Sequence, residues 1–305
     1  MNKFIFSIIN IFILIILFSC GYSAEERQLI FNKEKEILIK KEKMALKIAV
    51  TPTLDCLPAY IAQEQNMFKN HDVDVLLKTF NAQMDCDTAI IGKSVEGIFS
   101  DLVHTEYLKK HEKLELDYIS STNAYWQLIS NRKARIKNTK QLSDKMVGMT
   151  RFSATDYFTT KALSGSNKSQ LFKIQINDIN IRLAMLLNNE IDAVWLQEPF
   201  ASEARIKGNH VIADSRNYKN NMGVIAFRAE TKTNEHRKQQ ISSFIKTYNM
   251  ACDSINQNGI SHYANIIHKY CNISTKAIMS IPRLRYNHIS YPKESDIEIA
   301  SSFNK

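Results

Sequence analysis

From residue 46 onward, the hydrophobic positions follow two alternating periods. Apolar or alternating runs of about four to eight residues are typical of strands, and apolar residues at every third or fourth position are typical of helices. Strands are expected at residues 46–50, 73–80, 97–100, 114–121, 146–150, 173–176, 191–196, 211–213 and 224–227. Helices are expected at residues 57–68, 85–93, 102–110, 155–164, 181–188, 200–207, 235–256, 261–270 and 275–280. Strands that alternate with helices indicate an α/β protein with parallel sheets.

The alternation falls into two parts. An apolar and aromatic stretch at residues 124–130 ends in a basic patch at 132–137, and the rhythm restarts at residue 146. This pattern predicts two α/β units and contains no detectable internal repeat. The helices expected after residue 235 most simply pack back on the first unit.

Several segments, in this order and spacing, resemble periplasmic substrate-binding proteins of ABC importers. Residues 47–62 look like the first strand, cleft loop and first helix of that family, and residues 95–102 look like its third strand and the start of the next helix. The other matching segments are 66–68, 182–193 and 196–201, the last with a Glu-Pro turn that faces the cleft in the family. The nearest branch serves nitrate, sulfonates, taurine and thiamine-precursor pyrimidines.

The resemblance implies a type 2 periplasmic-binding-protein fold, with two lobes, two hinge crossovers and a ligand cleft between the lobes. We expect lobe 1 to comprise residues 45–126 and 222–305, and lobe 2 to comprise 127–221. The hinges are expected near 125–130 and 223–227. The function implied is capture of a small polar or heteroaromatic nutrient by lobe closure, and its delivery to an ABC permease and ATPase. We expect a monomer.

The first 20 residues resemble a bacterial lipoprotein signal. Asn2 and Lys3 precede an apolar run that ends at Phe18, shorter than the roughly 20 residues a membrane span needs. The run closes with Leu17-Phe18-Ser19-Cys20, so the resemblance implies cleavage before Cys20 and lipidation, for example palmitate, on that cysteine. An ordinary signal peptide or an N-terminal membrane anchor are the alternatives. Residues 21–44 are rich in charges of both signs and predict a tether, so the expected location is the cell envelope, periplasmic or extracellular.

Candidate ligand-binding residues follow from the rule that ligands bind at the carboxyl ends of strands in open α/β sheets. In lobe 1 this rule selects Thr53, Asp55 and Asp101, with further acids at Asp85 and Asp87. Carboxylates accept hydrogen bonds from amines or ring N–H groups, so these acids favour a ligand that is rich in N–H donors. For each acid taken alone, a helix cap or a surface position is the simpler interpretation, and only their concentration on one predicted edge favours a ligand.

In lobe 2 the same rule selects the start of the helix expected at residue 155. Ser153, Thr155 and Asp156 match a capping box, and a helix start with free N–H groups suits an anionic group. Arg151 is a candidate anion clamp. The remaining candidates are Glu198, in the loop after a strand, and the crossover aromatics Tyr125 and Trp126, on which a heteroaromatic ring would stack.

Four cysteines follow Cys20. Cys56 and Cys86 both open helices expected at one edge of lobe 1, which predicts a disulfide, and Cys252 with Cys271 is a second possible pair. Free buried thiols, or a metal or haem contact for Cys56 and Cys86, are the alternatives. No metal site is predicted, because the histidines between Cys252 and Cys271 match no zinc spacing.

Composition and charge exclude few functions. Apolar residues make up 44% and charged residues 23%, as in an ordinary globular protein. The net charge of +9 comes from scattered lysines, and an exported protein meets no DNA, so no nucleic acid partner is expected.

The chain contains no His-Glu-x-x-His, Gly-x-Ser-x-Gly or phosphate-loop motif, and its 8 glycines argue against a dinucleotide enzyme. We therefore expect no catalysis and no cofactor. A sensing or scaffold lipoprotein, or an enzyme on this fold similar to thiamine-pyrimidine synthase, remain as alternatives.

Overall fold

The computed structural model describes residues 24–71, 73–163 and 171–304. The chain divides into two compact units, residues 1–45 and 46–305. In the first unit, the described part is helix α2 (Ala24–Met44), which carries Glu25 and Glu26 in its first turn, where acidic side chains complement the helix dipole. The predicted signal peptide and the lipidation site Cys20 lie outside the described residues. Within the described ranges, no helix combines the length and hydrophobicity needed to cross a membrane.

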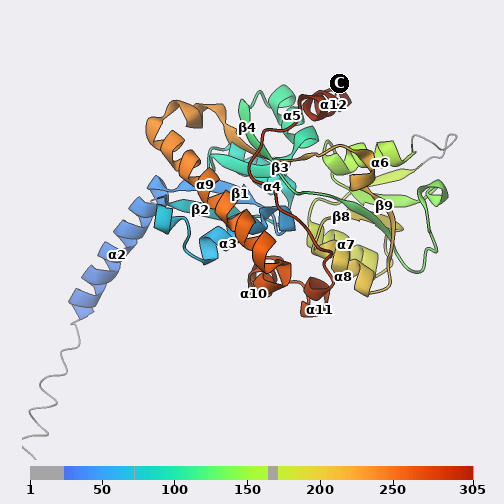
Figure 1. The fold of residues 1–305 in the computed structure, drawn as a ribbon, viewed down its shortest axis with the longest axis horizontal. Coiled ribbons are helices and arrows are strands. Elements are labelled where there is room, and N and C mark those ends of the chain that lie inside the picture. Colours follow the sequence, from blue (N-terminus) through green and yellow to red (C-terminus); the bar gives the residue numbers. More distant parts are fainter. Residues whose placement is uncertain (1–23, 72, 164–170, 305) are drawn as a thin grey trace, which may run out of the picture. The chain divides into compact units, whose positions relative to one another are not determined.

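The second unit contains two mixed sheets (Figure 1). The first sheet has the strand order β2-β1-β3-β10-β4. Its strands are β1 (Leu46–Val50), β2 (Val75–Thr79), β3 (Gly97–Asp101), β4 (Leu116–Ser121) and β10 (Gly223–Arg228). Strand β1 pairs in parallel with β2 and β3, whereas β10 runs antiparallel between β3 and β4.

Helices cover both faces of the first sheet. The chain passes from β1 through η1 (Leu54–Cys56) and α3 (Leu57–Glu64) to β2, and then through α4 (Gln83–Ile91) to β3. These two connections run in opposite directions along the sheet, so right-handed crossovers place α3 and α4 on opposite faces. Helix α5 (Leu102–His111) follows β3 and leads to β4.

The second sheet repeats this plan with the order β7-β6-β8-β5-β9. Its strands are β5 (Gln127–Ser130), β6 (Met146–Met149), β7 (Phe172–Gln175), β8 (Ala193–Leu196) and β9 (His210–Asp214). Strand β6 pairs in parallel with β7 and β8, and β5 runs antiparallel to β8 and β9. The helices of this part are α6 (Ala154–Leu163), α7 (Ile179–Leu187) and α8 (Phe200–Ile206), with the short turn η3 (Thr139–Gln141) before β6.

Two short segments link the sheets, one between β4 and β5 and one between β9 and β10, which includes η4 (Ser215–Tyr218). Each sheet therefore has three parallel strands, one antiparallel strand that directly follows a crossing, and a fifth strand at the edge beyond that antiparallel strand. This is the two-lobed α/β architecture that the sequence predicts. We call the part built on the first sheet lobe 1 and the part built on the second sheet lobe 2; the residue boundaries given above stay a prediction.

The C-terminal region makes a third crossing. After η5 (Ala229–Thr233), helices α9 (Glu235–Asn258) and α10 (Ala264–Cys271) pack on α3 of lobe 1, with η6 (Ile260–Tyr263) between them. Helix α11 (Thr275–Met279) instead packs on α8 of lobe 2. The chain then returns to lobe 1, where α12 (Glu294–Phe303), a helix the sequence analysis misses, packs on α5 (Figure 1). We call residues 280–293 the C-terminal strap.

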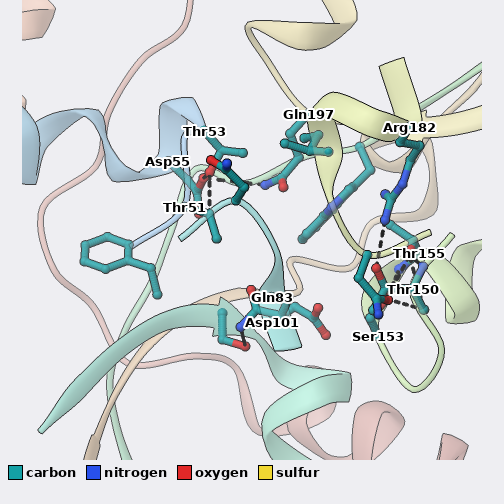
Figure 2. Close-up of a pocket in the computed structure, with 16 residues that line it drawn as sticks. Thr51, Thr53, Asp55, Gln83, Asp101, Thr150, Ser153, Thr155, Arg182 and Gln197 are labelled. Carbon is teal, nitrogen blue, oxygen red and sulfur yellow. Dashed lines mark hydrogen bonds between the residues drawn. The ribbon is translucent and has the colours of Figure 1, made fainter. Parts of the chain in front are cut away.

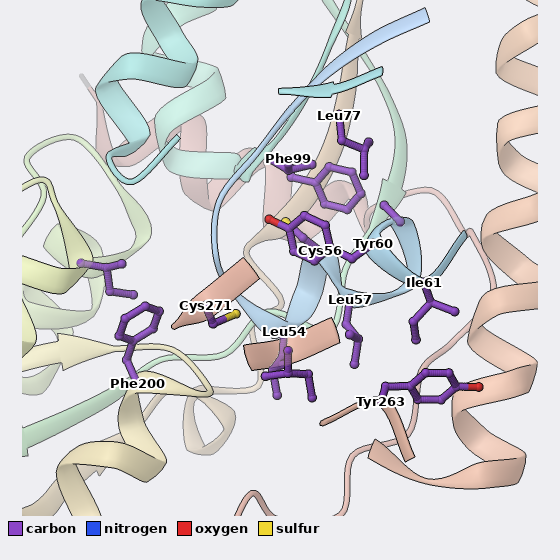
Figure 3. Close-up of a cluster of buried hydrophobic side chains, with 14 of the residues drawn as sticks. Leu54, Cys56, Leu57, Tyr60, Ile61, Leu77, Phe99, Phe200, Tyr263 and Cys271 are labelled. Atoms are coloured by element: carbon purple, nitrogen blue, oxygen red, sulfur yellow. The ribbon is translucent and has the colours of Figure 1, made fainter. Parts of the chain in front are cut away.

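A large hydrophobic cluster joins α3, β1 and the C-terminal helices (Figure 3). Leu57 and Ile61 of α3 are almost completely buried there, and Tyr60 stacks on Tyr270 of α10 with a ring separation of 3.9 Å. Full burial of side chains of this size contributes about 1.5–3 kcal/mol each. This cluster holds η1, and with it one wall of the site described below, against the sheet.

The predicted disulfides are absent: Cys56, Cys86, Cys252 and Cys271 are free and buried. Cys56 packs in the cluster that contains α3, whereas Cys86 packs in the cluster on the α4 side, so the reversal of strand order around β1 separates them. Cys252 and Cys271 share the first cluster, where they pack as small apolar side chains. Burial raises the pKa of all four thiols, to about 12 for Cys252, so the thiol form is favoured.

Candidate functional site

A small polar cavity lies between the two lobes, at the carboxyl ends of the strands (Figure 2). The space open to the centre of a water-sized sphere is about 60 Å³. A single water needs about 10–15 Å³ by this measure, so the cavity fits a ligand with few atoms. Its 16 lining residues are Thr51, Thr53, Asp55, Asn81, Gln83, Phe99, Ser100 and Asp101 from lobe 1, Trp126 from the first crossing, and Thr150, Ser153, Thr155, Asn177, Ile179, Arg182 and Gln197 from lobe 2.

Asp55 forms one part of the lobe 1 wall, in η1 directly after β1. Its Oδ1 accepts hydrogen bonds from the hydroxyl of Thr53 at 2.6 Å and from the amide of Gln197, across the cleft, at 3.5 Å. Its Oδ2 accepts one from the hydroxyl of Thr122 at 3.4 Å. Burial nevertheless raises the pKa of Asp55, because these neutral donors only partly replace hydration.

Asp101 forms the second part of the lobe 1 wall, at the end of β3. Its Oδ1 caps helix α5 by accepting from the backbone N–H of His104 at 2.8 Å. The same oxygen accepts from the N–H of Ala154, the first residue of α6 in lobe 2, at 2.9 Å. Burial is the largest influence and raises the pKa of Asp101 to about 6. This carboxyl group therefore joins two helix N-termini, one from each lobe.

The lobe 2 wall carries hydroxyl groups. The Ser153 hydroxyl donates to the carbonyl of Thr150 at 2.7 Å, and its oxygen accepts from the N–H of Thr155 at 3.1 Å. The Thr155 hydroxyl oxygen accepts from the N–H of Thr150 at 2.9 Å. Asp156, the other member of the predicted capping box, instead accepts from the N–H of Phe152 and pairs with Lys173 at 2.5 Å. It does not line the cavity.

Arg182 of α7 also belongs to the lobe 2 wall and is missed by the sequence analysis. Its guanidinium is buried and donates to the carbonyls of Ile176 and Trp195 and to the hydroxyl of Thr150, at 2.5–3.1 Å. Burial lowers the pKa of Arg182 to about 10, which leaves it charged at neutral pH. These partners are neutral oxygens, so they satisfy the donors of this cation but do not balance its charge.

One sequence signal points to Arg182. Helix α7 buries Ile179, Arg182, Leu183 and Leu186, which lie three or four positions apart on one face. An arginine within the apolar face of a helix indicates a buried cation that holds backbone carbonyls or a ligand.

Two predicted residues lie in an adjoining pocket. Tyr125 and Glu198 line a smaller pocket that shares Asp55 and Gln197 with the main cavity. The Tyr125 hydroxyl donates to Glu198 Oε1 at 3.2 Å, and Arg205 pairs with the same oxygen at 2.9 Å. The hydrogen-bonding capacity of the buried Glu198 carboxylate is thus used by Tyr125 and Arg205. Trp126, the other predicted aromatic residue, lines the main cavity.

The structure brings six predicted residues together around one cavity: Thr53, Asp55, Asp101, Trp126, Ser153 and Thr155. It leaves Arg151 exposed and outside the cavity. The missed polar lining residues include Asn81, Asn177 and Gln197, each of which directly follows the carboxyl end of a strand or lies two residues beyond it. The strand-end rule therefore selects loops that line the cavity, but it selects only some of the lining side chains.

Direct contacts close the lobes around the cavity. The N–H of Leu54 donates to the carbonyl of Glu198 at 3.0 Å. Phe152 of lobe 2 stacks on Tyr107 of α5 with a ring separation of 4.3 Å, and its carbonyl lies 2.9 Å from Nδ1 of His104. These contacts make the described arrangement a closed one.

His104 anchors this closure from lobe 1. Its Nε2 lies 2.5 Å from Asp87 Oδ2, so both ring nitrogens face acceptors and both donate. Burial lowers the pKa of His104, but the charge and hydrogen bond of Asp87 and the charge of Asp101 outweigh it and raise the value to about 9. The imidazolium therefore reaches across to the β6–α6 loop of lobe 2.

Within the described residues, no group of three or more His, Cys, Asp or Glu side chains is arranged to hold a metal ion. The donors around the cavity are hydroxyls, amides, two carboxylates and one guanidinium. These groups suit hydrogen bonding to a small organic or inorganic ligand.

Two sheets joined at crossings, with a polar cavity between them, define the class of two-lobed periplasmic-binding-protein folds. Within this class the chain belongs to the NMT1/THI5-like family, whose model matches residues 53–258. Among curated proteins, no sequence matches this chain.

Solved structures share the fold at low sequence identity. The ligand-binding component of an ABC-type import system from Staphylococcus aureus, with zinc bound, has a TM-score of 0.71 at 13% identity, over 85% of this chain and 90% of that chain. The periplasmic aliphatic sulphonate binding protein SsuA from Escherichia coli has a TM-score of 0.69 at 14% identity, over 85% and 90%. The periplasmic nitrate-binding protein NrtA from Synechocystis has a TM-score of 0.68 at 11% identity, over 82% and 75%.

An enzyme also shares the fold. The desulfurization enzyme DSZB has a TM-score of 0.59 at 9% identity, over 85% of this chain and 90% of that chain. The similar folds are therefore mostly those of binding proteins, and the fold by itself does not decide between binding and catalysis.

Proposed function

We propose that this protein is the extracytoplasmic solute-binding component of an ABC importer. It captures a small polar ligand between its two lobes and presents the closed form to a permease that is driven by an ATPase. The observation that carries the proposal is the interlobe cavity, because polar side chains of both lobes line it. The family membership and the named binding proteins of the same fold support it.

The two walls of the cavity favour a ligand that has both hydrogen-bond donors and hydrogen-bond acceptors. Asp55 and Asp101 on lobe 1 accept hydrogen bonds, so they suit amine or ring N–H groups. The hydroxyls of Ser153 and Thr155 and the cation of Arg182 suit an oxygen-rich or anionic group. Trp126 offers an apolar face for a small ring. The ligand is thus a small polar or heteroaromatic molecule with N–H donors at one end and acceptors at the other.

Closure is the functional step of this proposal. A ligand that touches Asp101 in lobe 1 and Ser153 in lobe 2 makes its full set of contacts only when the lobes meet. It therefore shifts the open and closed populations by its difference in affinity for the two states. In this scheme Tyr125, Glu198 and Arg205 support the wall from the adjoining pocket, and Arg151 and Asp156 lie outside the cavity that the ligand fills.

The test begins with mass spectrometry of small molecules that co-purify with the protein, followed by a thermal-shift screen of those compounds. A true ligand at about 100 times its dissociation constant stabilises the protein by roughly 2.7 kcal/mol. Asp101→Asn and Ser153→Ala should each weaken the binding of that compound at least tenfold. The exposed variant Arg151→Ala is the matched control and should bind as the wild type does.

Four outcomes decide against the proposal. Absence of any stabilising compound, or equal affinity in the cleft variants and the control, removes the cavity as a ligand site. Turnover of the compound by the pure protein favours the enzyme alternative. Tight binding with no stimulation of a permease–ATPase pair favours a sensor.

We further propose that the protein is held on a membrane by lipid on Cys20. The sequence motif that ends at Cys20 supports this, together with a charged helix, α2, between the motif and the lobes. Replacing Cys20 by serine should move the protein from the membrane fraction to the soluble fraction. Retention of Cys20→Ser in membranes, as for the wild type, would reject the lipid anchor.

A further inference from the structure

A groove with basic walls lies where the lobes are joined. Its walls come from the three segments that run between the lobes, namely residues 122–125, residues 215–221 and the C-terminal strap at 283–287. The space open to a water-sized sphere is about 440 Å³, several times that of the interlobe cavity. Volumes of about 300–1,000 Å³ are typical of small-molecule sites.

All of the charged side chains that line this groove are positive. Arg216, Lys219, Arg283 and Arg285 line it, and no aspartate or glutamate is among its lining residues. Arg216 is paired with Asp214 at 2.6 Å and lies over the ring of Tyr125, 4.1 Å from its centroid. The other three cations are exposed and form no ion pair with a described carboxylate. Several like charges in one concave site repel each other and concentrate anions from solution.

Side-chain hydrogen bonds between the three segments build the groove. Asn123 donates to the carbonyl of Arg285 and accepts from the N–H of Asn287 at 3.4 Å, which joins the first crossing to the strap. Asn221 donates to the carbonyl of Thr122 at 3.0 Å, which joins the second crossing to the first. The basic side chains therefore project from walls that are tied to one another.

We propose that this groove is a second binding site, for a small polyvalent oxyanion that carries two or more phosphate or carboxylate groups. Guanidinium groups bind such oxyanions through paired N–H donors, and Lys219 adds a point charge. The interlobe cavity is a poor site for the same ligand, because Asp55 and Asp101 line it and it is much smaller. The proposal is independent of the transport function.

The position of the groove gives the anion a further effect. An anion between Arg216 of the second crossing and Arg283 or Arg285 of the strap contacts two of the three segments that join the lobes, so opening of the lobes changes the conformation of its binding site. Its affinity then differs between the open and closed forms, and binding biases closure. Tyr125 links the two sites, since its ring contacts Arg216 and its hydroxyl donates to Glu198 beside the cavity.

The test is calorimetric titration of the full chain with pyrophosphate, and separately with citrate, at about 20 mM and about 300 mM salt. The wild type should bind at least one of them, more weakly at the higher salt. The double variant Arg283→Gln with Arg285→Gln should weaken binding at least tenfold. The matched control is Lys137→Gln with Lys140→Gln, which removes the same charge from an exposed turn outside the groove and should keep the wild-type affinity.

Each other outcome overturns the proposal. No binding of either anion by the wild type removes the site. An equal loss in the two double variants means that net charge alone attracts the anion. Unchanged affinity in Arg283→Gln with Arg285→Gln places the anion elsewhere, and the cleft variant Ser153→Ala then shows whether it binds between the lobes. The two arginine side chains are exposed, so the unfolding midpoint of the double variant should match that of the wild type.

Discussion

The two walls of the interlobe cavity are built from different chemistry. The lobe 1 wall carries two buried carboxyl groups, Asp55 and Asp101, whose pKa values burial raises. The lobe 2 wall carries hydroxyl groups and the guanidinium of Arg182, which stays charged below pH of about 10. A change of pH around 6 therefore changes the charge of Asp101 in the lobe 1 wall, whereas Arg182 in the lobe 2 wall stays charged.

This difference separates two structural roles. The lobe 2 wall is fixed by hydrogen bonds within its own lobe, such as those of Arg182 to the ends of β7 and β8. The lobe 1 wall instead forms a hydrogen bond to the other lobe, because Asp101 accepts from the N–H of Ala154 in lobe 2. Substitutions in lobe 2 should thus change stability at every pH, and substitutions of the lobe 1 acids should change how stability depends on pH.

The largest effect is expected at Arg182. Arg182→Ala leaves two buried carbonyls and a buried hydroxyl without their donor, each of which costs about 1–3 kcal/mol. The free energy of unfolding in denaturant should fall by about 3 kcal/mol or more, equally at pH 5 and pH 8. Arg182→Lys keeps the charge but lacks the planar donor group, so its free energy of unfolding should lie between those of the wild type and Arg182→Ala. Arg151→Ala, which is exposed, should change the value by less than about 0.5 kcal/mol; a similar loss at both sites would contradict the role given to Arg182.

The next effect is a change in pH dependence at Asp101. Its pKa is about 6 in the folded protein and 3.8 in its ordinary state, so folding favours the protonated form. The contribution of Asp101 to stability is therefore complete below pH 3.8 and is lost as the pH rises through 6. Asp101→Asn keeps an oxygen for the two N–H groups and cannot ionise.

Relative to the wild type, Asp101→Asn should gain on the order of 2–3 kcal/mol in unfolding free energy between pH 4 and pH 8. Denaturant titrations at the two pH values measure this gain. The exposed variant Asp144→Asn is the control and should run parallel to the wild type. A constant difference between Asp101→Asn and the wild type at both pH values would show that burial does not govern this carboxyl group.

The smallest effect is expected at Ser153. Ser153→Ala removes an oxygen that accepts from the N–H of Thr155 near the start of α6, and losing such a cap costs about 1 kcal/mol. Because no proton is exchanged, the loss should be the same from pH 5 to pH 8. Ser143→Ala, in an exposed turn, should leave the unfolding midpoint unchanged. A loss at Ser153 that varies with pH would weaken the contrast between the walls.

The order of strands and helices was predictable, because buried parallel strands such as residues 46–50 form short apolar runs bounded by polar residues. The residues at which these strands and helices begin and end were less predictable. The helix predicted at residues 57–68 ends at Glu64, where the chain turns through Asn66 with a positive φ of 55°. Helix α12 was missed after the strap, whose residues follow neither period and obscure the restart of a helical pattern at residue 294.

The candidate site was predictable only as far as strand ends indicate it. Thr53, Asp55 and Asp101 follow β1 and β3 closely, and they line the cavity. Arg182 follows no strand directly, and it reaches the cavity because α7 packs under the ends of three strands. Sequence proximity favours Arg151 for this role, but its side chain points to solvent.

The cysteine prediction failed for a related reason. Cys56 and Cys86 both follow strands of the first sheet, but they pack in different hydrophobic clusters. The face of the sheet that each helix covers depends on strand order, and strand order is set by pairing between distant segments. A pattern of local periods contains no information about that order.

The antiparallel strand β10 has a consequence for biosynthesis. A chain emerges with its N-terminus first, whether from the ribosome or from the channel through which an exported protein crosses the membrane. The second sheet uses only strands from β5 to β9, so it can assemble once Asp214 has emerged. The first sheet waits for Arg228, and until then β3 and β4 expose unpaired edges to which another strand can add. The lobe that is translated first is thus completed last, which makes its interval with open edges the period when the newborn protein most needs a chaperone.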